Sequence, residues 1–495
     1  MAERLIVLQT GIASAGARLA VLHLAFLVAA VWLKYVVGRI KPGGARLALA
    51  APILMCSVAG PWMFDGTEEV LPRLSTLFIF SWLCTFKVLA FCIGRAPLRE
   101  DMTVAQLAAI MMLPVFPKPE SRSKEGPEGR LHDTAGSGAA LAGRWVAKLV
   151  LLGLVVWLIN SYGDDMHGAA RHYLYAFGMY AFVGFLMDGP GAVAVEALGL
   201  QLVPTFDAPW LSTSLADFWG RRWNITTSSV LRTLVYDPIA EGRLLPDPAV
   251  AATGAAATGT GLTSGVNSRA ASTAQLPGAS APEPADDTNA DTDADTPNVN
   301  AKVRTDSAGP AAAATPKARV AQDGPTERRQ AGGSSSGAAG GSSSRGAVGR
   351  PSMLRRQLGL HASFLVSGLV HEYLAWSITH IGWHWKWTLF FYMQAPLMTL
   401  EGLARRAWRR AGLPPPPRLL ANLATVVVLE VMAYPLFFGF VETDTDLARR
   451  VVAAVSRNYQ AALEPLRPLL AGAAAAALAG PGGAADASRQ QQQEL

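Results

Sequence analysis

The residues best suited to acid–base chemistry share one polar face of an otherwise apolar segment, residues 357–375. Ser363, Ser367 and His371 follow one another at intervals of four residues. Four residues advance an α-helix by about 400°, so the three side chains lie on one face. An alcohol is barely ionised near neutral pH, and a positioned imidazole accepts its proton as the oxygen attacks an acyl carbon. His371 is therefore a candidate general base.

Glu372 follows His371 directly but lies about 100° around the helix. Ionisable groups deep in a membrane helix are costly, and they usually face a protein interior or a wet cavity. Glu372 and Ser367 are therefore candidates for contacting a substrate. The alternatives are a buried partner for Glu372 and a purely structural hydrogen bond between helices for His371. Gly359 and Gly368 would let another helix come close.

A second cluster of polar and aromatic side chains lies at residues 217–224 and continues to residue 238. Its arginines are suited to phosphates, its aromatic rings to a membrane interface or a stacked base, and its asparagine to a developing oxyanion. The alternative is an interfacial aromatic belt with positive charges on the cytoplasmic side, in which the aspartate only caps a helix. The candidate substrate-contacting residues are Asp217, Trp219, Arg221, Arg222, Trp223, Asn224, Arg232 and Tyr236.

Other patterns argue against several classes of site. His380 and His384 are four residues apart, but they fall at a predicted helix boundary among tryptophans, so no metal site is predicted. The three cysteines form neither a CxxC pair nor a disulfide framework. The sequence contains no G-x-S-x-G motif, no Walker A motif and no dinucleotide fingerprint. His172 falls at the end of a predicted lumenal loop, where exposure to solvent is expected.

The composition favours a multi-span membrane protein over a soluble enzyme. Of the 495 residues, 51% are hydrophobic and 16% are charged, whereas soluble domains carry about 25% charged residues. A membrane span needs about 20 mostly apolar residues. Eight spans are predicted, at 18–38, 47–64, 75–94, 145–161, 172–188, 357–380, 385–402 and 418–440. Shorter apolar stretches at 104–115 and 190–204 are predicted to be interfacial or re-entrant pieces.

The distribution of Lys and Arg predicts the orientation of these spans. Basic residues gather after the first, third, fifth and seventh spans and are scarcer in the loops between. Because positive residues mark the cytoplasmic side, both termini are predicted to be lumenal. The formal net charge of +6 then reflects membrane orientation, and no nucleic-acid partner is predicted. An all-α, polytopic bundle of about eight transmembrane helices is the expected fold.

A low-complexity segment divides the chain. Residues 242–352 are rich in Ala, Gly, Ser, Thr, Pro and Asp and contain no Phe, Tyr or Trp. Such a segment cannot bury enough apolar area to offset the entropy lost on ordering, so a disordered cytoplasmic insert is predicted. It separates an N-terminal membrane part, 1–241, from a C-terminal membrane part, 353–441. The Ala-rich segment 442–495 is predicted to be a flexible tail.

The two polar clusters together resemble the signature of a known enzyme family. The run Asp217-Phe-Trp-Gly-Arg-Arg-Trp-Asn224, with Leu231-Arg-Thr-Leu-Val-Tyr-Asp-Pro238 after it, is similar to the motif of plant-type wax synthases. These enzymes are a branch of the membrane-bound O-acyltransferase (MBOAT) superfamily, whose active-site histidine helix resembles Ser367-Gly-Leu-Val-His371-Glu. Residues 80–91 and 95–98 also resemble this branch. The similarity covers about residues 30–441, apart from the insert.

This resemblance implies a multi-pass enzyme of the endoplasmic reticulum that transfers a fatty acyl group from acyl-CoA to a long-chain alcohol. It assigns His371 as the catalytic base and Asn224 as its partner in the active site. Acyl-CoA is then a co-substrate, and no cofactor or metal is expected because a thioester is already activated. His371-Glu-Tyr373 also resembles the histidine motif of diacylglycerol acyltransferases, so diacylglycerol or a sterol stays open as the acceptor. A lipid transporter or membrane scaffold is the competing class, and the sequence leaves a homo-oligomer open.

Overall fold

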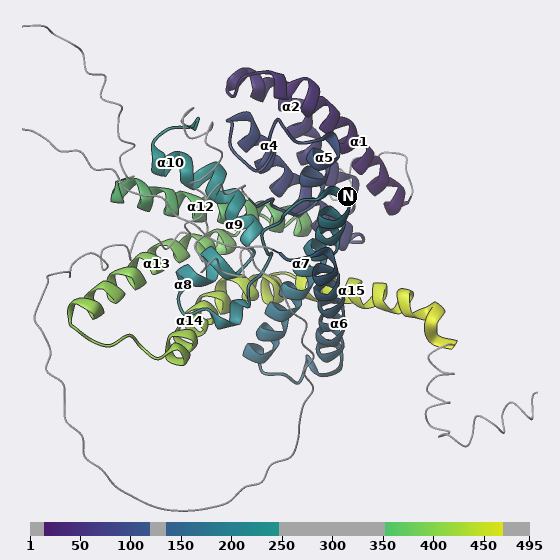
Figure 1. The fold of residues 1–495 in the computed structure, drawn as a ribbon. Helices are drawn as coiled ribbons and strands as arrows, with labels where there is room; N and C mark the ends of the chain where they lie inside the picture. The colour runs from purple at the N-terminus through teal and green to yellow at the C-terminus, as the bar shows by residue number, and fades with distance from the viewer. Residues whose placement is uncertain (1–13, 119–134, 247–351, 469–495) are drawn as a thin grey trace, which may run out of the picture. The chain divides into compact units, whose positions relative to one another are not determined.

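The computed structural model describes residues 14–118, 135–246 and 352–468, which belong to one unit (Figure 1). Every regular element in these ranges is helical, and an isolated antiparallel bridge joins Pro117 and Leu202. The predicted all-α class is therefore confirmed. The predicted insert lies outside the described residues except for 242–246 and Ser352, and so does the predicted tail beyond residue 468.

Six helical segments of the described ranges are long and apolar enough to cross a membrane, and each overlaps a predicted span. They are Ala15–Arg39, Gly44–Met63, Val70–Cys92, Gly138–Tyr162, Gly168–Leu198 and Arg418–Asp444. The other two predicted spans, 357–380 and 385–402, are the long helices α12 (Met353–Thr379) and α13 (Lys386–Arg410). Their polar and charged side chains keep them outside this set of six. The expected number of eight spans is thus not reached on length and composition.

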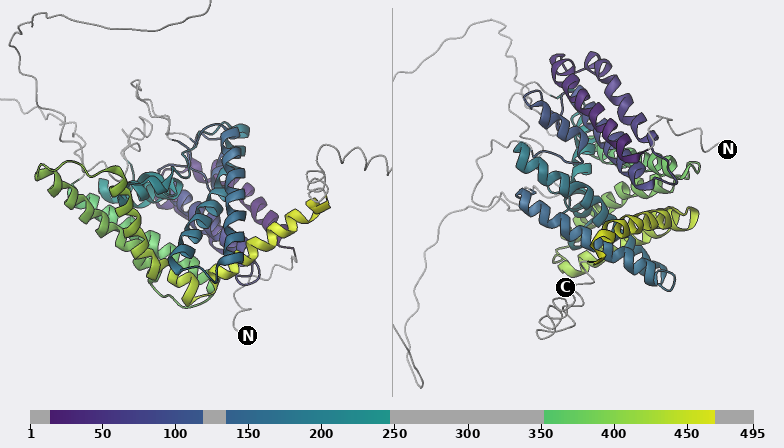
Figure 2. Two further views of the ribbon diagram at one scale, coloured as in Figure 1. Left: turned by 90° about the horizontal axis from the view of Figure 1, so that it is seen from below. Right: turned by 90° about the vertical axis from the view of Figure 1, so that its right-hand side faces the viewer.

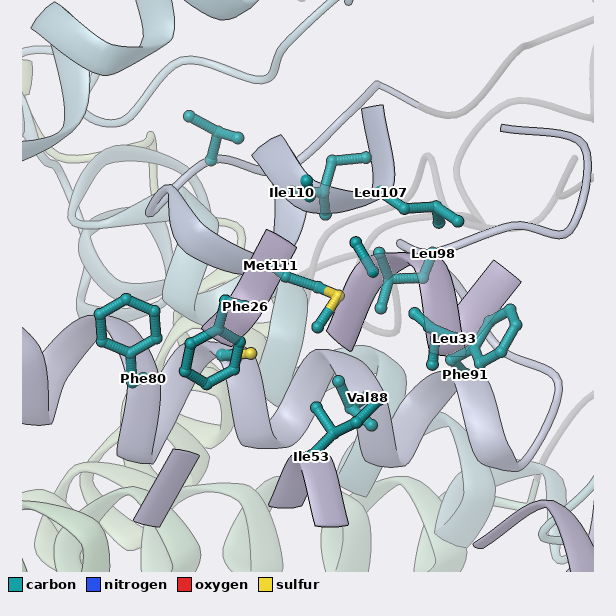
Figure 3. Packing of buried hydrophobic residues seen from close by; sticks show 14 of the residues in the cluster. Phe26, Leu33, Ile53, Phe80, Val88, Phe91, Leu98, Leu107, Ile110 and Met111 are labelled. Carbon is teal, nitrogen blue, oxygen red and sulfur yellow. The ribbon is translucent and has the colours of Figure 1, made fainter. Parts of the chain in front are cut away.

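The N-terminal helices pack around a hydrophobic core, which Figure 3 shows from close by. Its residues include Phe26, Leu33, Ile53, Phe80, Val88, Phe91, Leu107, Ile110 and Met111. The helical elements of this region are α1 (Ala15–Tyr35), Val37–Arg39, α2 (Gly44–Ala59), Gly60–Met63, α3 (Val70–Thr76), a π-helical segment at Leu77–Cys84, α4 (Thr85–Cys92) and α5 (Val104–Met112). The predicted short piece at 104–115 is α5. It begins with a capping box between Thr103 and Gln106 and packs on α1.

Helices α6 (Gly138–Tyr162) and α7 (Gly168–Leu198) pack side by side (Figures 1 and 2). A buried ion pair of 2.5 Å between Lys148 and Asp188 joins them. The stretch 190–204 is not a separate re-entrant piece, because α7 continues through Pro190 to Leu198. Proline is tolerated within a membrane helix where neighbouring groups satisfy the freed backbone. Gly199, with φ of +63°, ends the helix instead.

Short helical pieces follow α7, and longer helices form the C-terminal region. The pieces are Pro209–Leu211, α8 (Leu215–Asp217), a π-helical turn at Phe218–Arg222, α9 (Ile225–Leu231), a π-helical turn at Arg232–Tyr236 and α10 (Asp237–Glu241). After α12 and α13 come α14 (Arg418–Ala433), π-helical turns at Tyr434–Phe438 and Phe440–Asp444, α15 (Leu447–Leu463) and Glu464–Leu466. α12 packs on both α13 and α10 (Figure 1). α15 packs on α6, so this part of the predicted flexible tail is an ordered helix.

Candidate active site

A cavity of about 520 Å³ lies among helices from both membrane parts of the chain. Most of its wall is apolar, with side chains from α6, α7, α9, α12, α13, α14 and α15. The two clusters found in the sequence meet at this cavity, although more than a hundred residues separate them along the chain. The predicted site residues that line it are Trp219, Trp223, Asn224, Arg232, Tyr236, Ser367 and His371.

His371 lines the cavity with its imidazole in a defined orientation. Its Nδ1 lies 2.7 Å from the carbonyl oxygen of Ser367, one helical turn earlier. A carbonyl oxygen only accepts hydrogen bonds, so Nδ1 carries the proton and Nε2 keeps its lone pair. The described residues contain no hydrogen-bond partner for Nε2. This tautomer can accept a proton or a hydrogen bond at Nε2.

Three aromatic rings hold the imidazole of His371. Phe391 of α13 stacks on it, with centroids 3.7 Å apart and planes inclined by 20°. Trp82 and Trp387 meet it edge to face, at centroid distances of 4.8 and 6.0 Å. Trp387 and Phe391 both lie on α13, and Trp82 lies in the π-helical segment Leu77–Cys84, so no pattern local to α12 predicts that these rings surround His371.

Asn224 caps a helix and also lines the cavity. It adopts a left-handed conformation with φ of 40° and ψ of 62°, which asparagine tolerates better than most residues. Its Oδ1 accepts a hydrogen bond of 3.2 Å from the backbone N–H of Thr227 and so caps α9. Because Oδ1 is engaged in this way, Nδ2 is the group of this cavity-lining side chain that is left to donate hydrogen bonds.

Trp219 connects the 217–224 cluster to α13. Its Nε1 donates a hydrogen bond of 3.0 Å to Oε1 of Gln394, which is fully buried. Its ring also lies edge to face with Phe391, at a centroid distance of 5.8 Å. Trp223 stacks instead on Phe218, with centroids 5.4 Å apart. Both tryptophans therefore form part of the cavity wall as packed residues.

Asp217 is a structural anion and does not line the cavity. Its two carboxylate oxygens pair with Arg221 at 2.8 Å and with Arg222 at 2.9 Å. Ser214, rather than Asp217, caps the short helix α8. Arg222 also donates to the carbonyl of Asp207 at 3.0 Å. The buried carboxylate is compensated by both arginines, and none of the three lines the cavity.

Glu372 also lies outside the cavity wall, because it caps α13. Its Oε1 accepts hydrogen bonds of 2.8 Å from the backbone N–H groups of His384 and Trp385. Its Oε2 accepts from the backbone N–H and hydroxyl of Thr388, at 3.2 and 3.3 Å. The side chain thus satisfies donors at the start of α13, where an anion is also favoured by the helix dipole.

Arg232 and Tyr236 line the cavity on the 217–238 side. Arg232 lies 3.4 Å from Asp237 and packs over the ring of Tyr236, 5.8 Å from its centroid. Burial raises the pKa of the Asp237 carboxyl, although Arg232 acts in the opposite direction. Gly359 of α12 lies against Tyr236, where an added Cβ would be 3.1 Å from its carbonyl oxygen. The predicted close approach at this glycine is confirmed.

His172 is buried, so the expectation of a solvated loop residue is wrong. α7 begins at Gly168 and places His172 inside the helix, where it is 2% exposed. Its Nε2 lies 2.8 Å from Oε2 of Glu442, and its ring lies against Phe438. No local pattern could have revealed this, because the partner comes 270 residues later.

His380 and His384 lie in the connection between α12 and α13, as the predicted helix boundary required. The ring of His380 lies near Trp62, and that of His384 near Phe440. Within the described ranges, no group of three or more His, Cys, Asp or Glu side chains is arranged to hold a metal ion.

The comparisons with known proteins point to one chemical class. The chain is 27% identical over 205 residues to acyl-CoA–sterol O-acyltransferase 1 of Arabidopsis thaliana, covering 41% of this chain and 57% of the relative. It is 28% identical over 221 residues to a long-chain-alcohol O-fatty-acyltransferase of Simmondsia chinensis, covering 43% and 59%. It is 29% identical over 207 residues to probable long-chain-alcohol O-fatty-acyltransferase 9 of Arabidopsis thaliana, covering 41% and 56%.

The chain thus spans less than three fifths of the length of these curated relatives. No protein-family model matches it, and no solved structure matches it at a significant level. The six apolar helices and these similarities support a multi-pass membrane protein. The resemblance to the long-chain-alcohol O-fatty-acyltransferases, or wax synthases, is confirmed.

Proposed function

We propose that this chain is an acyl-CoA-dependent long-chain-alcohol O-fatty-acyltransferase, a wax synthase of the MBOAT superfamily that resides in the endoplasmic reticulum. One observation carries the proposal. His371 and Asn224 line the same cavity with complementary groups, a lone pair on Nε2 and hydrogen-bond donors on Nδ2. Acyl transfer to an alcohol requires both a proton acceptor and a donor for the oxyanion.

The reaction follows from these two groups. Nε2 of His371 takes the hydroxyl proton as the alcohol oxygen attacks the thioester carbonyl carbon. Nδ2 of Asn224 donates a hydrogen bond to the oxyanion of the tetrahedral intermediate. The intermediate collapses, the carbon–sulfur bond breaks, and the imidazolium returns its proton to the departing CoA thiolate. The products are the ester and free CoA, and the thioester supplies the driving force without a cofactor.

The cavity wall is suited to two apolar chains, and its composition favours direct transfer of the acyl group from CoA to the alcohol. Its long aliphatic and aromatic wall accommodates an acyl chain and the alcohol, which arrives from the bilayer. Arg232 is the one Lys or Arg among the described residues that line it, so we place the CoA phosphates on that side. The three cysteines of the chain lie outside this wall, which favours direct transfer over a cysteine acyl-enzyme.

Two other acceptors and one non-enzymatic role compete with this proposal. The similarity to a sterol O-acyltransferase favours a sterol as the second candidate acceptor. Diacylglycerol is the third, on the resemblance of the histidine motif. A lipid transporter or scaffold would use the same cavity but would leave the thioester intact.

The test is an acyl-transfer assay in microsomes from cells that lack their own neutral-lipid acyltransferases. Labelled acyl-CoA is offered with fatty alcohol, diacylglycerol and sterol in parallel. We expect label in wax ester, reduced at least about 10²-fold in His371→Ala. His361→Ala is the matched control, because His361 lies on the same helix, contacts Tyr392 and does not line the cavity.

Label in sterol ester or triacylglycerol would keep the chemistry and change the acceptor. Intact acyl-CoA with inserted protein would favour the transporter. Equal activity in His371→Ala would remove this residue as the base.

A further inference from the structure

The cavity has a second polar position that the proposed reaction does not use. Among the described residues that line the cavity, Glu430 of α14 is the one carboxylate. His172 of α7 is buried next to Glu430 and is not itself part of the cavity wall. Nε2 of His172 faces a carboxylate oxygen of Glu442 at 2.8 Å, and a carboxylate only accepts, so Nε2 carries a proton. Glu442 is paired in addition with Arg171.

Two atoms of this position lack a hydrogen bond. Oε1 of Glu430 and Nδ1 of His172 are 3.7 Å apart, which is too far for a direct hydrogen bond. Both are buried and have no hydrogen-bond partner in the described part of the chain. A hydroxyl oxygen about 2.8 Å from each atom would span this gap. Its O–H would donate to the carboxylate, and the same oxygen would accept a hydrogen bond from Nδ1–H of an imidazole that carries a proton on both ring nitrogens.

The surroundings indicate that this hydroxyl belongs to an apolar molecule. Phe438 stacks on His172 at a centroid distance of 4.8 Å, and Tyr434 lies at 4.5 Å. The wall beyond Glu430 continues with aliphatic side chains of α6 and α15. A single hydroxyl carried on a hydrocarbon chain fits such surroundings better than a charged or strongly hydrated group.

The second position is also separate from the base. Three aromatic rings connect the two places. Phe438 meets Phe437 at a centroid distance of 5.4 Å, Phe437 meets Phe391 at 6.2 Å, and Phe391 stacks on His371. One hydroxyl group cannot occupy both places at once. A ligand that uses both must carry a polar group at each end of its chain.

We propose that Glu430 and His172 bind a second hydroxyl group, at the far end of a lipid chain whose reacting end lies at His371. This inference deepens the proposed function, on which it rests, by naming bifunctional lipids as preferred substrates. The second hydroxyl can be carried by the acceptor, as an α,ω-diol, or by the acyl group, as an ω-hydroxyacyl chain.

The test is equilibrium binding of labelled ligands to the purified full chain in lipid nanodiscs. One arm compares a long-chain alcohol with the α,ω-diol of the same length, over a series of lengths. The other arm compares acyl-CoA with the matching ω-hydroxyacyl-CoA. We expect one hydroxylated ligand to bind roughly tenfold tighter than its plain counterpart, with an optimum at one chain length.

Variants locate the preference. Glu430→Leu should abolish it, and Glu430→Gln, which keeps one acceptor oxygen, should weaken it. Thr425→Val is the matched control, because Thr425 lies on the same helix, lines the cavity and bonds its hydroxyl to Ala421 within the helix. This variant should keep the preference.

The outcomes separate this site from the proposed function. No preference in either arm, or a preference that persists in Glu430→Leu, overturns the hydroxyl site. Wax-ester synthesis from simple alcohols without any preference overturns the site alone. A preference that depends on Glu430, in a protein that transfers no acyl group, supports the site and refutes the acyltransferase.

Discussion

Phe391 and His371 lie face to face, with ring centroids 3.7 Å apart. Phe391 also contacts Trp219, and the centroids of these two rings are 5.8 Å apart. One phenylalanine on α13 therefore joins the 217–224 cluster to the proposed base on α12. The position of the imidazole depends on this contact as well as on its own helix.

Replacing Phe391 should disturb the base without removing it. In Phe391→Leu the imidazole loses its stacking surface, and we expect kcat to fall roughly ten- to a hundredfold. The KM for acyl-CoA should change little. Phe390→Leu is the control, since Phe390 is equally buried but makes its ring contacts with Trp219, Phe391 and Phe437. Steady-state kinetics that show equal losses for both variants would contradict the special role of Phe391.

Asn224 allows the cap and the oxyanion donor to be tested separately. Asn224→Asp keeps an oxygen for the Thr227 N–H but removes the Nδ2 donors. We expect an unchanged melting temperature in detergent and a fall in kcat of about 10²–10³-fold. Asn224→Gly accommodates the positive φ but loses both the helix cap and the Nδ2 donors, so its melting temperature should also be lower. An active Asp variant would exclude Asn224 as the donor.

Glu372 should act on stability rather than on substrate binding. Glu372→Ala leaves buried donors at the start of α13 unsatisfied, at a cost of about 1–3 kcal/mol for each buried group. We expect a clear loss of thermal stability in detergent. Glu372→Gln keeps part of the cap and should retain the wild-type KM for acyl-CoA and alcohol. A raised KM at an unchanged melting temperature would instead make Glu372 a substrate-binding residue.

The crossing of α12 and α13 should be sensitive to a single methyl group. A Cβ on Gly368 would lie 2.8 Å from the Cα and carbonyl oxygen of Thr388. We expect Gly368→Ala to destabilise the protein by about 1–3 kcal/mol, because backbone cannot move aside as a side chain can. Gly402→Ala on α13 has open space and should be neutral or slightly stabilising. Thermal unfolding of both variants in detergent gives the comparison.

The helices and the candidate residues were easier to predict from the sequence than the residues that contact them. The long apolar runs located the helices, and the residue types in the two motifs pointed to His371 and Asn224, which line one cavity, because helix periodicity and side-chain chemistry are local properties. The role of Glu372 was not predictable in this way. Two of its four donors belong to the turn before α13, where Trp385 adopts a left-handed backbone conformation, and the other two belong to Thr388 in the first turn of the helix.

The position of His172 was hidden for a related reason. Of its two carboxylate neighbours, Glu430 lies within α14 and Glu442 lies in the π-helical turn Phe440–Asp444, so their approach to α7 depends on tertiary packing and on the turns between them. Short π-helical turns of this kind leave no periodic signal. The partner of Arg221 and Arg222 was not predicted either. Their side-chain type suggested phosphate binding, but both pair with Asp217.

The residues just before and just after the long low-complexity segment lie against each other. Arg355 at the start of α12 donates to the carbonyl of Glu241 at 3.3 Å, and Gly242 lies directly beside its guanidinium. Because these two ends already lie in contact, a connection of any length that reaches across this short gap can join them, and a change in its length should leave the described membrane parts in place. A protein cut within this connection could reassemble from two co-expressed membrane fragments.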